Sequence, residues 1–161
     1  MVSHAHDIES AEKLVFPGVG SFGSMMRILK EKKLVAPLRK YLLADRPFLG
    51  ICLGMQALFG TSEESGDVEG LGIFPGQSRR FDIPSAVPHI GWNGIHIKQS
   101  SPLFNGLSGE ENVYFVHSFF VEAEDTSVIL TTTDYDIEFV SAVQKGNVMG
   151  TQFHPEKSGP V

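Results

Sequence analysis

The stretch "GICLGMQ", residues 50–56, decides the fold because it joins an apolar run to a helical pattern through the only cysteine of the chain. The apolar run "PFLGI" (47–51) is typical of a strand buried on both faces of a parallel sheet. The residues after it follow helical spacing and predict a helix that ends by Gly60. Cys52 lies at the turn, between two glycines that leave room for a sharp bend. A thiol at a strand-to-helix turn resembles a nucleophile elbow, and the helix N-terminus favours the reactive thiolate. The alternative is that Cys52 is a small buried core residue.

A glycine-rich stretch precedes this turn. "VFPGVGSFG" (15–23) contains G-x-G-x-x-G, between a strand-like "KLVF" (13–16) and a helical pattern that begins at Ser21. That spacing occurs in dinucleotide-binding loops. A dinucleotide fold, however, carries an acidic residue at the end of its second strand to hold the ribose, and Cys52 takes that place. Cys52 thus argues against a dinucleotide-binding loop. No cofactor is expected for this chain.

The remaining periodicity predicts the fold class. A further helix is expected from Pro37 to about Asp45, since proline is favoured in a first turn. The second half is strand-like in four segments with turn residues between them: 111–123, 127–133, 138–145 and 147–153. We predict one α/β domain over residues 1–161, with a mostly parallel sheet flanked by helices and a β-rich, partly antiparallel second half.

Composition excludes several classes of function. The chain has 161 residues and a net charge of −6, with only 13 basic residues, so nucleic-acid binding is not expected. No apolar run is long enough to cross a membrane, and no secretory signal is recognisable at the start. A single cysteine excludes an internal disulfide and indicates a reducing compartment. His4 and His6 lie in a polar stretch where solvated side chains are expected, so we predict no metal site.

His154 stands apart among the six histidines. It lies in "QFHPEKSG" (152–159), where Pro155 favours extended backbone at the residue before it. Residues two apart in an extended chain share a face, so Glu156 is expected beside the imidazole. A nucleophile, a base and a carboxylate that orients the base would then be complete in Cys52, His154 and Glu156. The alternative is a loop histidine without function.

At this point the motifs resemble a known family. "GICLGMQ" followed far downstream by "QFHPE" is similar to the class I glutamine amidotransferases, whose catalytic triad is Cys, His and Glu. "FPGVGSFG", "PHIGWN", "YFVHSFF" and "TQFHPEKSG" resemble the glutaminase part of imidazole glycerol phosphate synthase, in histidine biosynthesis. The resemblance runs from Lys13 to Gly159 and implies a flavodoxin-like α/β fold. It also implies that the glycine-rich loop forms part of an oxyanion hole after a peptide flip.

The resemblance implies roles for individual residues. Cys52 attacks the side-chain amide of glutamine, His154 transfers the protons and Glu156 orients His154. The oxyanion is held by the backbone N–H groups of Val19 and Leu53. The implied substrate-binding positions are Gly20, Gln56, Glu64, His117, Ser118 and Phe119. For Glu64 the alternative is a capping box with Thr61.

The resemblance further implies a partner that receives the ammonia, a (β/α)8 cyclase present as a separate subunit or as a fused domain. Trp92 and Asn93 are expected at that interface, although Trp92 could instead be a core anchor. Two other hypotheses stay open: a non-catalytic module that docks on the cyclase, and an amidotransferase of another pathway. We expect a cytoplasmic location or another reducing compartment, a plastid if the source is a plant. Compared with the family, the domain is expected to be incomplete, without the first strand-helix unit and the last helix.

Overall fold

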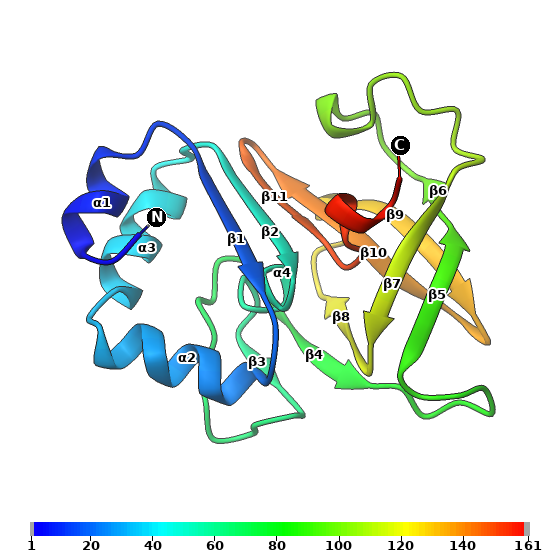
Figure 1. Cartoon of the computed structure of the whole chain (residues 1–161), viewed down its shortest axis with the longest axis horizontal. Coiled ribbons are helices and arrows are strands. Elements are labelled where there is room, and N and C mark those ends of the chain that lie inside the picture. Colours follow the sequence, from blue (N-terminus) through cyan, green and yellow to red (C-terminus); the bar gives the residue numbers. More distant parts are fainter. Residues whose placement is uncertain (1, 160–161) are drawn as a thin grey trace.

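The computed structural model describes residues 2–159. Helices α2 (Phe22–Glu31) and α3 (Val35–Leu43) follow the predicted pattern, and Ser21 caps α2 by accepting a hydrogen bond from the Ser24 N–H. The other helical elements are short: α1 (Ala5–Ser10), α4 (Leu53–Gln56) and the 3-10 turns η1 (Pro102–Phe104), η2 (Thr126–Val128) and η3 (Pro155–Lys157). Figure 1 shows α1, α2 and α3 gathered beside β1, at the end of the molecule away from the β-rich half.

The strands are, in chain order, β1 (Leu14–Gly18), β2 (Phe48–Cys52), β3 (Thr61–Ser62), β4 (Gly76–Arg80), β5 (His89–Gly94), β6 (His96–Ile97), β7 (Asn112–His117), β8 (Phe119–Ala123), β9 (Ile129–Tyr135), β10 (Ile137–Lys145) and β11 (Val148–Thr151). In the described residues the larger sheet runs β1-β2-β11-β10-β8-β4-β3, with β9 also paired to β10 and β6 to β9. β1, β2 and β11 are parallel, whereas β10 is antiparallel to β11, β8 and β9. The smaller sheet is the antiparallel pair β5-β7. The predicted α/β class with a β-rich second half is confirmed, but the larger sheet is mixed rather than mostly parallel, because the strands of the second half join it in antiparallel pairs.

Two apolar cores hold this arrangement together. The first lies between the helices and the parallel strands and includes Phe22, Leu38 and Phe48. The second fills the space between the β5-β7 pair and the larger sheet and includes Phe115 and Phe139. The site described below lies where the carboxyl ends of β1 and β2 meet β7, as expected for an open α/β sheet.

Several local features add to what the sequence predicted. The helix after Cys52 ends at Gln56, before Gly60 as expected, and the chain then turns toward the short strand β3. The polar N-terminal stretch, for which no helix was predicted, contains α1 with a capping box between His4 and Asp7, and His4 and His6 are both exposed as expected. The capping box proposed for Thr61 and Glu64 does not form, because Thr61 belongs to β3 and no helix begins there.

Candidate active site

Cys52 occupies a strained turn between β2 and α4. Its backbone has φ 54° and ψ −111°, a conformation that a residue with a side chain rarely adopts and that is common at functional sites. The neighbouring glycines make the turn possible by close packing. A Cβ on Gly50 would lie 2.6 Å from the Gly54 oxygen, and one on Gly54 would overlap the Phe16 oxygen. The geometry is that of the predicted elbow.

A cavity of about 350 Å³ opens at this turn, and its volume falls in the range of small-molecule sites. Ten of the residues singled out in the sequence line it: Cys52, His154, Val19, Leu53, Gly20, Gln56, Glu64, His117, Ser118 and Phe119. Gly18, Pro88 and Val116 complete the lining. Segments from both halves of the chain thus converge on the cysteine.

His154 is fixed at the edge of this cavity. Its backbone N–H donates to the Tyr114 oxygen at 2.9 Å, and Ser158 Oγ donates to its carbonyl at 2.7 Å. Its Nδ1 lies 2.8 Å from Glu156 Oε1. Glu156 belongs to the turn η3 rather than to an extended segment, yet its carboxylate reaches the imidazole as expected. Among the described residues, the buried Nε2 of His154 has no hydrogen-bond partner.

The pKa values of Cys52 and Glu156 are shifted in opposite directions. Burial raises the pKa of the Cys52 thiol to about 11, and Glu156 adds to the rise, whereas the Leu53 N–H and the Gln152 amide oppose it. Partial burial pushes the pKa of Glu156 upward, but hydrogen bonds from His154 and its own backbone outweigh it. The net pKa of Glu156 lies below its ordinary value. The carboxylate is therefore ionised beside Nδ1, while the thiol keeps its proton at neutral pH.

Sequence reasoning missed one residue in contact with the thiol. Gln152, which is fully buried, places its Nε2 3.5 Å from Cys52 Sγ. Its Oε1 accepts from Gln56 Nε2 at 3.0 Å, and the same Gln56 nitrogen donates to the Phe119 oxygen at 3.0 Å. The only available signal was its position two residues before His154, which places it near the site.

Two buried histidines contact each other at the cavity: His117 lines it, and His89 lies behind His117. His89 Nδ1 is 3.1 Å from His117 Nε2, and His117 Nδ1 is 2.8 Å from the Phe119 oxygen. Burial lowers the pKa of His117 to about 3 against a raising hydrogen bond to Phe119, and burial also lowers the pKa of His89. Both rings are neutral and belong to the core, whereas His96 is exposed and lies 2.9 Å from Asp134.

The glycine-rich loop and Glu64 meet at the other side of the cavity. Glu64 Oε2 accepts from the Phe22 N–H, in the first turn of α2, at 2.7 Å. Gly20 has φ +93°, in the left-handed region that favours glycine, and a Cβ added to it would meet no atom within 4 Å. Val19 is 85% exposed.

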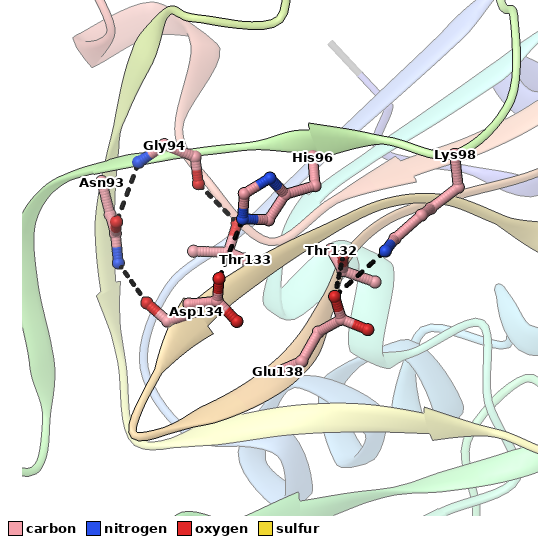
Figure 2. Close-up of polar contacts among 8 residues, drawn as sticks. All are labelled: Asn93, Gly94, His96, Lys98, Thr132, Thr133, Asp134 and Glu138. Carbon is pink, nitrogen blue, oxygen red and sulfur yellow. Dashed lines mark hydrogen bonds and ion pairs between the residues drawn. The ribbon is translucent and has the colours of Figure 1, made fainter.

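The predicted interface residues lie on β5. Trp92 is 55% exposed, so the alternative of a core anchor is wrong. Ile90, two residues away on the same strand face, is 60% exposed. Asn93 points the other way: Figure 2 shows its side chain between Gly94 and the Asp134 carbonyl, to which its Nδ2 donates at 2.8 Å. The same figure shows Lys98, which follows β6, paired with Glu138 on β10.

Metal-binding and membrane-spanning features are both absent from the described residues. They contain no cluster of three or more His, Cys, Asp or Glu side chains that could hold a metal ion. Within residues 2–159, no helix has both the length and the apolar character needed to cross a membrane.

A family model described as Glutamine amidotransferase class-I matches residues 3–160. The chain is 49% identical over 161 residues to the imidazole glycerol phosphate synthase subunit HisH of Syntrophotalea carbinolica, with 96% of this chain and 78% of that protein covered. It is 47% identical over 159 residues to the HisH subunit of Aquifex aeolicus, covering 98% and 77%. The Arabidopsis thaliana protein named imidazole glycerol phosphate synthase hisHF, chloroplastic, is 46% identical over 159 residues, which cover 96% of this chain and 27% of that protein.

The fold is also similar to that of solved structures whose sequences are much less alike. A solved structure described as "Crystal structure of glutamine amidotransferase" matches with a TM-score of 0.74 at 19% identity, covering 96% of this chain and 76% of that one. At this identity the likeness concerns the fold alone.

Proposed function

The chain belongs to the class I glutamine amidotransferases, and from that membership we propose that it hydrolyses glutamine in the cavity lined by Cys52 and His154. Its similarity to HisH subunits assigns the reaction to imidazole glycerol phosphate synthase, in histidine biosynthesis. The main observation in support of this site is that the buried Nε2 of His154 has no hydrogen-bond partner among the described residues. His154 lines the same cavity as Cys52, whose backbone is strained.

The first step forms a thioester. Because burial raises the pKa of the Cys52 thiol to about 11, the thiol must lose its proton as it attacks the side-chain amide carbon of glutamine. His154 Nε2 takes this proton, and the ionised Glu156 at Nδ1 stabilises the imidazolium that results. His154 then protonates the departing nitrogen, which leaves as ammonia while the C–N bond breaks.

The second step restores the enzyme. His154 removes a proton from water, the resulting hydroxide attacks the γ-glutamyl thioester, and Cys52 leaves as the thiol. The balance is glutamine plus water to glutamate plus ammonia. In both steps the oxyanion is held by the Leu53 N–H at the start of α4 and, after a flip of the Gly18–Val19 peptide, by the Val19 N–H. One such donor lowers the barrier by about 3–4 kcal/mol.

Substrate binding uses the remaining residues of the cavity. One oxygen of Glu64 is bound to the Phe22 N–H, and its other oxygen is assigned to the α-amino group of glutamine. Gln56, with its nitrogen engaged internally, offers its Oε1 to the substrate. Gly20, His117, Ser118 and Phe119 shape the wall.

The ammonia passes to a (β/α)8 cyclase, present as a separate subunit or as a fused domain. The exposed Ile90 and Trp92 on β5 support an interface at this face, since large apolar side chains concentrate binding energy when a partner covers them.

The test combines labelling and turnover. A diazoketone analogue of glutamine should alkylate Cys52, identified by mass spectrometry, and Cys52→Ala should abolish both labelling and glutamate release in the presence of a cyclase subunit. Ammonium-driven product formation should stay within about twofold for the same complex, because free ammonia bypasses the glutaminase. If ammonium sustains turnover and glutamine does not, the chain is a docking module rather than an enzyme.

A further inference from the structure

A chain of hydrogen bonds leads from the Phe119 carbonyl through Gln56 and Gln152 to the Cys52 thiol, and the donor and acceptor of each bond follow from the groups involved. The Phe119 carbonyl oxygen can only accept, so the Gln56 atom at 3.0 Å from it is the amide nitrogen. The second hydrogen of that nitrogen points to Gln152, which must present its Oε1 at 3.0 Å. The Gln152 nitrogen is therefore the atom that faces Cys52 Sγ at 3.5 Å.

A second chain of hydrogen bonds, through His89 and His117, also ends with a donor to the Phe119 carbonyl oxygen. Asn93 Nδ2 donates to the Asp134 carbonyl at 2.8 Å and lies 3.4 Å from His89 Nε2, which must accept. His89 then donates from Nδ1 to His117 Nε2, and His117 donates from Nδ1 to Phe119. Each ring carries one proton, in agreement with the lowered pKa values of both histidines.

From this geometry we propose that Gln152 is a positioning residue, whose amide N–H holds Cys52 Sγ in place for attack and whose orientation is fixed by Gln56 and the Phe119 carbonyl. Gln152 is fully buried and is absent from the residues that line the cavity, so it acts on the sulfur without touching the substrate. A donor aimed at the sulfur favours the thiolate over the thiol. The inference rests on the proposed glutaminase function.

Two substitutions at Gln152 test the role. Gln152→Met keeps the length and burial of the side chain but removes the donor, and Gln152→Asn keeps the amide but withdraws it by one carbon from the sulfur. The matched control is Thr131→Val, which deletes an equally buried hydrogen bond, to Ser141 Oγ at 2.8 Å, outside the cavity.

The first measurement is the rate at which iodoacetamide alkylates Cys52 in the full chain, as a function of pH. The chain has one cysteine, so the label reports this site alone. We expect the profile of both Gln152 variants to move to higher pH by about one unit, which lowers the rate near neutral pH about tenfold. Thr131→Val should leave the profile in place.

The second measurement is glutamine hydrolysis in complex with a cyclase subunit. The Gln152 variants should lose about tenfold in kcat with KM within about twofold, because they do not touch the substrate. The inference is overturned if the alkylation profiles coincide with wild type, if Thr131→Val moves them equally, or if KM rises while kcat is kept. If wild type is alkylated but hydrolyses no glutamine, the proposed function fails, and the alkylation profiles alone still decide the role of Gln152.

Discussion

Mild acid should destabilise the fold through His117. Burial lowers the pKa of this histidine to about 3 in the folded chain, and the nearby His89 and His154 act in the same direction, while the hydrogen bond to Phe119 opposes them. In the unfolded chain the pKa returns to about 6.5. Between these values the unfolded state binds a proton that the folded state rejects. The stability contribution is therefore present above about pH 6.5 and is lost as the pH falls toward 3.

The size of the effect follows from linkage. Integrating the proton difference for one group from about pH 7 to about pH 5 gives a loss of about 2 kcal/mol in the free energy of unfolding. Over this range the carboxylates change little in protonation, since their ordinary pKa values lie near 4. His89, whose pKa burial also lowers, adds to the loss.

The assay is urea unfolding, followed by circular dichroism, at a series of pH values. In His117→Asn the amide nitrogen can still donate to Phe119, but no group titrates at this position. We expect the variant to be less stable than wild type near pH 7, with a pH-dependent loss smaller by about 2 kcal/mol. The matched control His96→Asn, on an exposed histidine of β6, should keep the wild-type slope. Parallel curves for His117→Asn and wild type would refute the argument that His117 is buried in its neutral form.

Three other substitutions test separate parts of the site. Glu156→Gln should lower kcat about a hundredfold with a small change in KM, measured by glutamate release, since the imidazolium loses its ionised partner. Gly54→Ala should cost about 3 kcal/mol or more in urea unfolding, because its Cβ would overlap a β1 carbonyl oxygen, whereas Gly66→Ala, with open space around it, should change stability by less than about 0.5 kcal/mol. Trp92→Ala should weaken cyclase binding about thirtyfold, measured by calorimetry, without changing the stability of the fold. The control is Ile28→Ala, at an exposed residue of α2. Equal affinities for both variants would place the interface elsewhere.

The elements that could be predicted from sequence are those with strong local signals. The buried strand before Cys52 and the amphipathic helix after Ser21 show clear periodicity, and both were found where expected. α1 and the strands β4 and β5 were missed, because their stability comes from partners far along the chain. β4 consists of "GQSRR" and has no apolar alternation, yet it forms a ladder with β8. Propensity cannot reveal such pairing, since tertiary contacts decide it.

The residues of the site also divide into those that the sequence could predict and those that it could not. Cys52, His154 and Glu156 were predictable because their chemistry requires those residue types next to particular turns. Gln152 was not, because nothing in its local sequence distinguishes a glutamine that touches a sulfur from one that faces solvent. Its contact arises from the parallel pairing of β11 with β2, which brings residues 100 positions apart together.

The glycine-rich stretch illustrates how one spacing can serve different structures. In a dinucleotide fold the glycines admit a pyrophosphate to the N-terminus of the following helix, where N–H groups and the helix dipole attract the anion. In this chain the Phe22 N–H at that position already donates to the Glu64 carboxylate at 2.7 Å, and Gly23 donates to Ser65 Oγ at 3.2 Å. A phosphate would have to displace the Glu64 carboxylate, which is also negatively charged. Gly18 instead packs against α4, where a Cβ would lie 2.7 Å from that of Leu53, and so brings β1 close to the Cys52 turn. The residues that would receive a cofactor in another fold thus line the same cavity as Cys52.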